Sequence, residues 1–321
     1  MQALRFHEFG KPLEVLRLEE VELPPLEDGE VCLRMLAAPV NPADLNLIEG
    51  TYGVKPPLPA IPGIEGCGEV VESASPDFSP GDRAIILRRA GSWASHVQIA
   101  AEDLFKLPPS IDPLQAAMLK VNPATAWRLL TGFERPGAGE WIVQNAANSA
   151  VGRCVIALAK KLGIRTVNLV RRAELREELL ALGADEVLLD DDAAVEAVKK
   201  KELRPMLGFN CVGGESALRV MNLLAPGGTH VTYGAMARRP LTVPNGLLIF
   251  KDLKLRGLWI TKWIGNAPRA ELAEVYARLA EMIIDGDLAM PVEATFSLKD
   301  FAKAIEALAV PGRNGKVLLA T

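Results

Sequence analysis

Apolar residues follow two different periods along this chain, and the change falls after about Pro113. Before it, short alternating runs such as EVCLRMLAAPV and GCGEVVES are separated by turns rich in proline and glycine, which is typical of strands in an antiparallel sheet. After it, continuous apolar runs such as WIVQN and TVNLV alternate with helical periods. Such strands with helices between them favour a parallel sheet covered on both faces. The pattern therefore predicts two domains of different architecture.

The clearest helical period lies in VGRCVIALAKKLG, where Val151, Val155, Leu158 and Leu162 share one face and Gly163 follows as a stop. A second helix, ELREELLALG, precedes the strand EVLLD, and MLGFNCVG, GTHVTYG and LKLRGLWI are three more strand candidates. The C-terminal segment from LAMPVEATF to KVLLAT returns to a strand, helix, strand pattern. We expect this segment to complete the first domain.

The segment VQNAANSAVG joins the first of the later apolar strands to its helix. A G-x-G-x-x-G turn would place glycines at Ala147, Ser149 and Gly152, and only the third glycine is present. Ala147 is nearly as small as glycine, Asn148 and Ser149 add side-chain donors, and the helix still presents free N–H groups to a phosphate. On this pattern alone, a nucleotide loop and an ordinary strand–turn–helix stay equally open.

Two arginines, Arg171 and Arg172, follow the second of these strands, about 20 residues beyond the turn. A site for NAD would place an acid there to bind the ribose 2′-hydroxyl, whereas arginine pairs with a 2′-phosphate. The alternative is that both arginines are solvated at the start of the helix RRAELREELL. Together the turn and the arginines favour NADPH over NADH as the cofactor.

Composition excludes several classes of protein. The chain has 321 residues, 49% of them hydrophobic and 24% charged, which suits a globular protein of two domains. A net charge of −4 gives no basic footprint for nucleic acid, and no stretch reaches the roughly 18 apolar residues of a membrane span. The start, MQALRFHEFG, has no leader pattern, so we expect a cytoplasmic location. None of the cysteines forms a C-x-x-C pair, and we expect all to be buried and reduced: Cys32, Cys67, Cys154 and Cys211.

Seven segments occur in an order that closely resembles one family. They are NPADLNLIEGTYG, LPAIPGIEGCGEVV, KVNPATAWRLL, VQNAANSAVG, FNCVGG, VTYGAMA and LLIFKDLKLRGLWITKW. The family is that of the mitochondrial-type 2-enoyl thioester reductases, also called trans-2-enoyl-CoA or enoyl-[acyl-carrier-protein] reductases, in the zinc-free branch of the medium-chain dehydrogenase/reductase superfamily. The resemblance covers nearly the whole chain, and the glycine-poor loop matches the family's own version. It implies that the loop binds a nucleotide.

The same resemblance argues against a metal. Zinc members of the superfamily carry Gly-His-Glu in the segment that is GIEG here, and Ile64 stands at the histidine position, where it cannot ligate a metal. The cysteine-rich lobe of the zinc enzymes has no counterpart either. We therefore expect no metal site, and metal-assisted alcohol oxidation is disfavoured.

The resemblance also implies roles for individual residues. Tyr52, in EGTYG, matches a tyrosine that assists reduction, and its alternative is a loop tyrosine that packs against prolines. Asn122 matches a position that helps to hold the cofactor, and without the resemblance it would be an N-cap. The other implied cofactor-binding residues are Asn148, Ser149, Ala150, Val151, Arg171, Arg172, Tyr233, Gly234, Ala235, Met236, Leu258, Trp259, Ile260 and Lys316.

Three of these positions have open alternatives. Relatives carry an acid and then arginine where this chain has Arg172 and Ala173, so Arg172 takes over the lost contact or the phosphate geometry differs. Trp259 is either a pocket wall or a core tryptophan. Lys316 is either a cofactor contact or a surface lysine.

For the whole chain, the resemblance implies a GroES-like antiparallel β-barrel domain, catalytic, formed by residues 1–118 and 265–321. It implies a doubly wound parallel Rossmann domain, which binds NADPH, at residues 119–264. A homodimer is expected through the strand LKLRGLWI. An acidic carrier protein would need a basic surface, for which the arginines available are Arg88, Arg89, Arg238 and Arg239.

The implied activity is NADPH-dependent reduction of the C2–C3 double bond of trans-2-enoyl thioesters, on coenzyme A or acyl carrier protein, in fatty acid synthesis. Within the same superfamily the alternative is an NADPH:quinone oxidoreductase. The alternative from another class is a non-catalytic NADPH-binding protein, and an alcohol dehydrogenase comes third.

Overall fold

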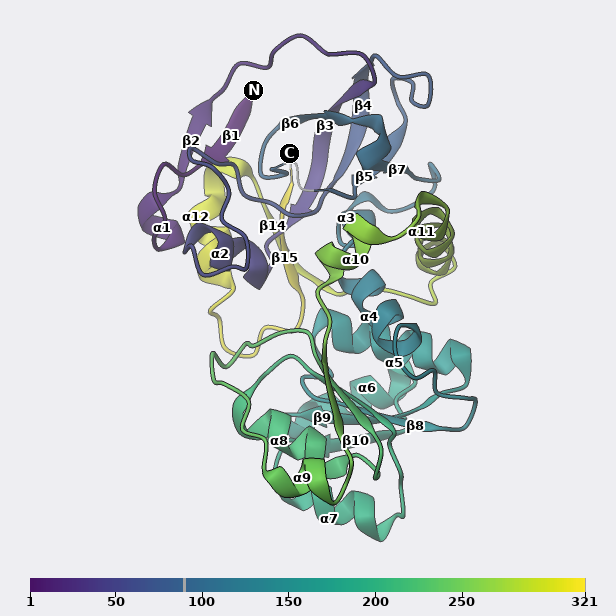
Figure 1. The fold of residues 1–321 in the computed structure, drawn as a ribbon. Coiled ribbons are helices and arrows are strands. Elements are labelled where there is room, and N and C mark those ends of the chain that lie inside the picture. Colours follow the sequence, from purple (N-terminus) through teal and green to yellow (C-terminus); the bar gives the residue numbers. More distant parts are fainter. Residues whose placement is uncertain (89–90, 321) are drawn as a thin grey trace. The chain divides into compact units, whose positions relative to one another are not determined.

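The structure is a computed structural model that describes residues 1–88 and 91–320. The chain divides into two compact units (Figure 1). Unit 1 comprises Met1–Val121 and Thr261–Thr321, and unit 2 comprises Asn122–Ile260. These limits lie three and four residues from the expected boundaries at residues 118 and 264. In the part of the chain that the structure describes, no helix is both long and apolar enough to cross a membrane.

Unit 2 is built on a six-stranded sheet in which every pairing is parallel and the order is β10-β9-β8-β11-β12-β13. This is the doubly wound order, in which the chain starts in the middle and reverses direction beside β8. Its strands are β8 (Trp141–Gln144), β9 (Arg165–Val170), β10 (Glu186–Leu189), β11 (Leu207–Asn210), β12 (Thr229–Thr232) and β13 (Lys254–Gly257). Its helices are α4 (Asn122–Thr131), α5 (Ala150–Leu162), α6 (Arg176–Leu182), α7 (Ala193–Lys200), α8 (Gly214–Leu223) and α9 (Asn245–Ile249), with a 3-10 turn η2 (Ala173–Leu175).

The central strands are largely buried because helices cover both faces of the sheet. Ile142 and Val143 on β8 and Phe209 on β11 are fully buried. Helix α5 begins at its N-cap Ser149, whose side chain accepts a hydrogen bond from the Gly152 N–H. It ends at Gly163, whose φ of 71° is the left-handed conformation that only glycine adopts without strain. The predicted start and stop of this helix are confirmed.

Unit 1 contains a mainly antiparallel sheet in the order β14-β15-β3-β4-β5-β7, with β6 also paired to β3, and a separate β1–β2 ladder. Its strands are β1 (Gln2–Arg5), β2 (Arg17–Glu20), β3 (Glu30–Pro39), β4 (Cys67–Ser73), β5 (Arg83–Ile86), β6 (His96–Ala100), β7 (Leu104–Lys106), β14 (Val292–Phe296) and β15 (Lys316–Ala320). Its helices are α1 (Pro12–Val15), α2 (Pro42–Ile48), α3 (Pro113–Ala117), α11 (Arg269–Ile284) and α12 (Phe301–Ala307), with 3-10 turns η1 (Ala101–Asp103) and η3 (Leu298–Asp300); α10 (Ile260–Asn266) begins at the unit boundary.

The expected closed barrel is not what unit 1 forms in the described residues. The sheet path ends at β14 on one side and β7 on the other, and no pairing joins them. The long strand β3 is shared instead: residues 30–34 pair with β6, and residues 37–39 pair with β15. The C-terminal strand, helix, strand pattern is confirmed, and β14 and β15 lie parallel because α12 crosses between them.

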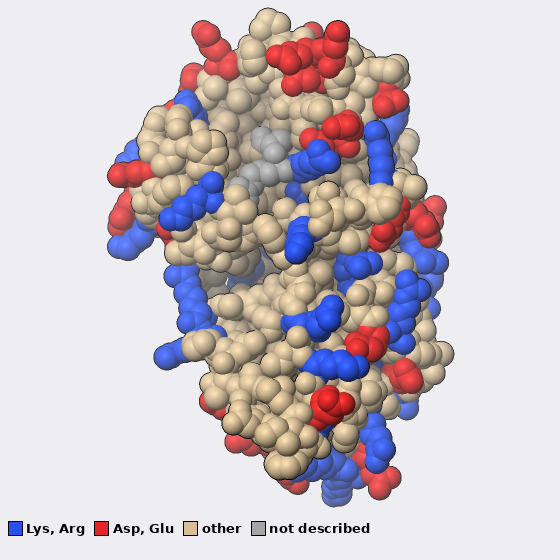
Figure 2. Space-filling view, viewed as in Figure 1, with Lys and Arg blue, Asp and Glu red and all other residues tan. Residues whose placement is uncertain are grey.

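The four cysteines are free and buried, as expected for a reduced protein. Acidic and basic side chains are interspersed over the face seen in Figure 2, in keeping with a net charge of −4.

His230 on β12 supplies a pH-dependent contribution to stability. Its side chain is fully buried, and neither ring nitrogen has a hydrogen-bond partner among the described residues. Burial lowers the pKa of His230 to about 4 from its ordinary 6.5. Between these values the unfolded chain binds a proton that the folded chain rejects, so stability falls as pH drops from 6.5 toward 4.

From pH 7 to pH 5 the unfolding free energy of the wild type should fall by about 2 kcal/mol more than that of His230→Leu. This follows from a slope of ~1.4 kcal/mol per pH unit below the unfolded pKa. Urea unfolding at the two pH values measures this loss. The exposed His7 provides the control variant His7→Gln. An equal pH-dependent loss in wild type and His230→Leu would contradict the assignment.

Candidate functional site at the carboxyl edge of the parallel sheet

The predicted phosphate loop lies directly after β8, at the edge where the parallel strands end. Gly152 packs against the turn so closely that a Cβ atom there would lie 2.5 Å from the Ala147 carbonyl oxygen. The Ser149 hydroxyl accepts from the Gly152 N–H at 3.1 Å, which holds the first turn of α5 in place. The structure thus contains the close approach of helix and strand for which the third glycine of the fingerprint is needed.

The strained residue of this loop is Ala146. Ala146 has φ of 47°, the left-handed region that normally favours glycine. Ala147 is not among the residues of positive φ, and its side chain is fully buried. The tight turn is therefore made one residue earlier than the glycine spacing suggests.

Sequence reasoning missed a buried arginine that supports the loop. Arg153 is 5% exposed, and its Nε donates to the Asn148 carbonyl at 3.1 Å. Its guanidinium also pairs with Glu178 on α6, at 2.7 Å between Nη2 and Oε1. The available signal was a charged residue directly after Gly152, in the otherwise apolar first part of the helix.

A second unpredicted element is an amide network that joins β8 to β11 where the strand order reverses. Asn145 Nδ2 donates to Asn210 Oδ1 at 2.8 Å and to the Ser216 hydroxyl at 2.9 Å. Asn145 Oδ1 accepts from the Cys211 N–H at 3.0 Å. All of these polar groups are buried, so their hydrogen bonds fix the carboxyl ends of β8 and β11 relative to each other.

The other predicted residues of unit 2 fall at neighbouring strand ends. Arg171 and Arg172 follow β9; Arg171 is exposed, and Arg172 lies 3.6 Å from Glu174 between Nη1 and Oε1. Tyr233, Gly234, Ala235 and Met236 follow β12, and Leu258, Trp259 and Ile260 follow β13. Trp259 is 41% exposed, so the core alternative is wrong for this residue. Because the strands are parallel, these segments line the same edge as the loop.

One predicted cofactor residue, Asn122, carries a buried polar atom, Nδ2, without a hydrogen-bond partner among the described residues. Asn122 is the first helical residue of α4 and is buried. Burial, with help from the Cys211 thiol, raises the pKa of Tyr233 well above its ordinary value, while the nearby Ser149 hydroxyl lowers it. A buried amide without a partner in unit 2 fits the binding of a polar ligand such as a dinucleotide.

The predicted residues of unit 1 both connect to helix α2. The backbone N–H groups of Thr51 and Tyr52 donate to the Asn46 carbonyl, at 2.9 and 3.0 Å. The half-buried Tyr52 ring packs against the cluster that includes Phe6 and Leu47. The Lys316 ammonium donates to Asn41 Oδ1, so Lys316 is not an isolated surface lysine.

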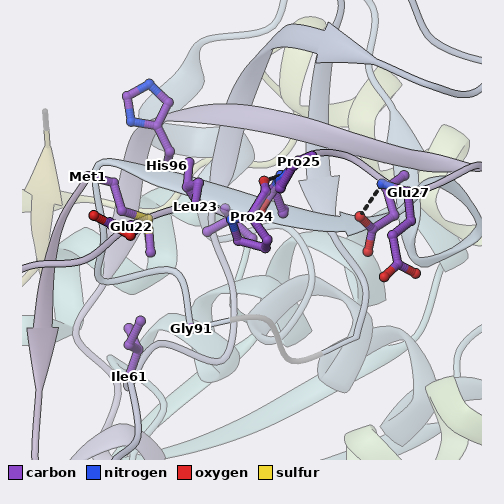
Figure 3. Close-up of a pocket in the computed structure, with 12 residues that line it drawn as sticks. Met1, Glu22, Leu23, Pro24, Pro25, Glu27, Ile61, Gly91 and His96 are labelled. Carbon is purple, nitrogen blue, oxygen red and sulfur yellow. Dashed lines mark hydrogen bonds between the residues drawn. The ribbon is translucent and has the colours of Figure 1, made fainter.

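The remaining predicted residues and the pocket give less support for a functional site. Arg88 is neutralised by Asp103 at 3.1 Å between Nε and Oδ1, Arg89 lies outside the described residues, and Arg238 and Arg239 are exposed. A pocket of about 320 Å³ in unit 1, lined by residues such as Glu22, Pro25 and His96, contains none of the predicted site residues (Figure 3). No cluster of three metal-ligating side chains occurs within residues 1–88 and 91–320.

Comparison with known proteins decides the family. The chain is 40% identical to the mitochondrial enoyl-[acyl-carrier-protein] reductase of Rattus norvegicus, over 99% of this chain and 88% of that protein. It is 43% identical to the protein of that name from Arabidopsis thaliana, with the same two coverages. The chain belongs to the enoyl-[acyl-carrier-protein] reductase family. Its predicted membership is confirmed, and with it the assignment of the chain as an oxidoreductase.

Matches to broader domain families agree with the reductase family. Residues 27–109 match the alcohol dehydrogenase GroES-like domain, and residues 150–281 match the zinc-binding dehydrogenase domain. The second name refers to zinc, whereas this reductase chain has Ile64 where the zinc members carry histidine.

Solved structures extend the comparison over the full length of the reductase chain. A complex described as Etr1p with NADP and crotonyl-CoA has a TM-score of 0.90 at 27% identity and covers 100% of this chain and 99% of that one. The Etr1p/Etr2p heterodimer of Candida tropicalis, described as a mitochondrial 2-enoyl thioester reductase, has the same four values. A putative NADPH:quinone reductase from Bacillus thuringiensis has a TM-score of 0.93 at 29% identity, with coverages of 100% and 98%.

The expected cytoplasmic location is contradicted. The enoyl reductases to which the chain is similar are named as mitochondrial proteins in rat and in Arabidopsis.

Proposed function

We propose that the protein reduces the C2–C3 double bond of trans-2-enoyl thioesters with NADPH, on coenzyme A or acyl carrier protein, in fatty acid synthesis. The observation that carries this proposal is the 40% identity to an enoyl reductase over 99% of the chain. The solved relative with NADP and crotonyl-CoA supports the cofactor and the thioester class. The phosphate-loop geometry after β8 supports a dinucleotide independently of these names.

We assign cofactor binding to unit 2, as its Rossmann sheet suggests, and catalysis to unit 1, as a GroES-like domain. Residues 119–264 and residues 1–118 with 265–321 are the corresponding expected ranges. The cofactor-binding residues in this proposal are Asn122, Asn148, Ser149, Ala150, Val151, Arg171, Arg172, Tyr233, Gly234, Ala235, Met236, Leu258, Trp259 and Ile260, with Lys316. We further propose that the reaction is zinc-independent, because Ile64 cannot ligate a metal.

The chemistry of the thioester sets the demand on the protein. NADPH, when bound, supplies a hydride to the β-carbon of the enoyl thioester. Negative charge then develops on the thioester oxygen, and a hydrogen-bond donor must stand where that charge appears. We assign this role to the Tyr52 hydroxyl, as donor to the enolate oxygen or as proton source for the α-carbon.

The test is NADPH oxidation at 340 nm with crotonyl-CoA and trans-2-decenoyl-CoA, run beside a quinone and repeated with NADH. Oxidation that requires an enoyl thioester and prefers NADPH supports the proposal. Oxidation with the quinone alone would overturn it.

A quinone oxidoreductase is the second candidate, and the structure with a TM-score of 0.93 favours it by its name. Such an enzyme needs an apolar slot but no dedicated proton donor. We rank it second because the chain is 40% identical to an enoyl reductase over 99% of its length. If NADPH binds in a fluorescence titration but neither the enoyl thioesters nor the quinone are reduced, the non-catalytic NADPH-binding alternative replaces both.

We expect Arg171→Ala to raise the Kd for NADPH by about 10-fold or more, because a charge-assisted hydrogen bond to the 2′-phosphate is worth about 1.5–3 kcal/mol. The Kd for NADH should stay unchanged, since NADH lacks that phosphate. Fluorescence titration of both cofactors measures the two constants. The exposed Arg176 on α6 gives the control variant Arg176→Ala, and equal effects of the two substitutions would contradict the role of Arg171.

We also propose a homodimer formed through β13. This strand ends the six-stranded sheet, and all four of its residues are exposed. Beside it in sequence, Ile249 is 69% and Phe250 87% exposed, although both are large apolar residues. A second copy of the chain would satisfy the open edge and cover these side chains.

Light scattering should therefore give twice the 34.6 kDa of one chain. Phe250→Asp is expected to shift this mass toward the monomer, because it places a charge in the apolar contact. Val310, which is 57% exposed in unit 1, gives the control Val310→Asp. A monomeric wild type would exclude the dimer.

A further inference from the structure

A buried polar cluster in unit 1 centres on Glu65, whose side chain is fully buried. Its Oε1 accepts a hydrogen bond from Asn41 Nδ2 at 2.8 Å, and its Oε2 accepts one from the Val121 N–H at 2.8 Å. The Ser92 hydroxyl donates to the Glu65 carbonyl at 2.5 Å. The two carboxylate oxygens thus hold two segments that lie far apart in the sequence.

Both segments matter to the proposed reaction. Asn41 is the N-cap of α2, and the Asn46 carbonyl near the other end of this helix accepts the Tyr52 N–H. Val121 is the last residue of unit 1 before the chain enters unit 2. One carboxylate therefore contacts both the N-cap of the helix that precedes the Tyr52 turn and the point where the chain leaves the unit.

Charged groups face Glu65 from several elements. Lys316 on β15 donates to Asn41 Oδ1, and Lys120 donates to the Ile64 carbonyl. Asp44 on α2 accepts from the N–H groups of Asn41 and Ile64, both at 2.9 Å. Tyr276 on α11 donates to the Lys120 carbonyl at 3.1 Å.

The surroundings of Glu65 bring the pKa of its carboxyl group near neutrality. Burial raises its pKa to about 7, against the attraction of Lys316, the hydrogen bonds from Asn41 and Val121 and the weaker attraction of Lys120. A protonated carboxyl has one oxygen that is a donor and would face another donor. Protonation therefore breaks one of the two contacts.

We propose that Glu65 is a positioning residue for the reduction: its ionised carboxylate fixes α2, and through it the Tyr52 turn, relative to the end of unit 1 at Val121. Lys316 acts with it by holding the other side of the Asn41 amide. This inference rests on the proposed function for its kinetic part and on geometry alone for its structural part.

The structural part is tested by hydrogen exchange on the Glu65→Gln variant. A glutamine amide can accept at one position only, so the Asn41 or the Val121 contact is lost. Exchange of the Thr51 and Tyr52 amides, which bond to Asn46, should become at least about ten-fold faster than in wild type. Glu69→Gln, on the neighbouring strand β4, is the control because it removes a carboxylate paired with Arg34 at 3.1 Å, with Glu69 32% exposed.

The kinetic part is tested by the pH profile of crotonyl-CoA reduction. In wild type kcat should fall as pH drops through about 7, since the ionised form is the active one. Glu65→Gln should lower kcat by about ten-fold or more and abolish that acidic limb, while the Kd for NADPH stays unchanged. A Glu65→Gln substitution that only destabilised the fold would leave the fall of kcat at low pH in place.

The outcomes separate the two proposals. A wild type that does not reduce crotonyl-CoA overturns the proposed function, and the exchange experiment then decides the role of Glu65 by itself. Unchanged exchange at Thr51 and Tyr52 overturns the positioning role, as does an acidic limb that persists in Glu65→Gln. If Glu65→Gln does not fold, the wild-type exchange rates at pH 6 and pH 8, corrected for intrinsic rates, replace it, and no difference between them overturns the proposal.

Discussion

Replacing Tyr52 by phenylalanine is expected to lower kcat for crotonyl-CoA reduction by about 100-fold or more, the usual loss when a positioned proton donor is removed. The ring should keep its place, because it packs against the apolar cluster of unit 1 and its backbone N–H bonds to Asn46. The Kd for NADPH should not change, since the predicted cofactor residues other than Lys316 lie in unit 2. Steady-state kinetics with a parallel fluorescence titration separate the two effects.

The matched control for this experiment is Thr51→Ala. It removes a hydroxyl from the same turn, where Thr51 Oγ1 donates to the Asn46 carbonyl at 3.3 Å. We expect it to leave kcat nearly unchanged. A Tyr52→Phe enzyme with wild-type turnover would show that Tyr52 is a packing residue and that another group meets the charge of the enolate.

Gly152→Ala is expected to destabilise the protein by about 3 kcal/mol and to weaken NADPH binding strongly. The added Cβ would lie 2.5 Å from the Ala147 carbonyl oxygen and 2.7 Å from the Ala147 carbonyl carbon and Cα. These are backbone atoms, so relief requires the amino end of α5 to move away from the turn. Urea unfolding measures the first effect, and cofactor titration measures the second.

Gly246 on α9 provides the comparison within the same unit. A Cβ there would meet only the Phe250 ring, at 3.6 Å, which is an ordinary contact. Gly246→Ala should therefore change the unfolding free energy by less than about 0.5 kcal/mol. If Gly152→Ala proves equally mild, the loop is looser than its geometry implies, and the fingerprint argument for its third glycine fails.

Local patterns were sufficient to predict most of unit 2. Its strands, the limits of α5 and the position of the loop all depend on periods and caps that act over a few residues. Helix α11 followed an equally clear period at Leu272, Val275, Tyr276 and Leu279, all now buried, although our prediction did not include it. The strained residue of the loop was not predicted, because no spacing rule anticipates a left-handed alanine at position 146.

Contacts across long sequence distances were not predictable in the same way. Asn145 and Asn210 are 65 residues apart, and Lys316 and Asn41 are 275 apart. Each side chain by itself looks like an ordinary polar residue, and only the fold brings it to its partner. The same applies to the sheet of unit 1, in which β3 divides one edge between β6 and β15.

The place of β15 has a consequence for the order in which the protein can fold during synthesis. This strand, Lys316–Ala320, lies between β14 and β3, so the first 121 residues lack a neighbour until the last strand leaves the ribosome. Unit 2 is continuous, and its 139 residues from Asn122 to Ile260 can fold as soon as they emerge. The nascent chain must therefore hold an unfinished sheet, with an open edge on β3, while the middle of the protein is already complete.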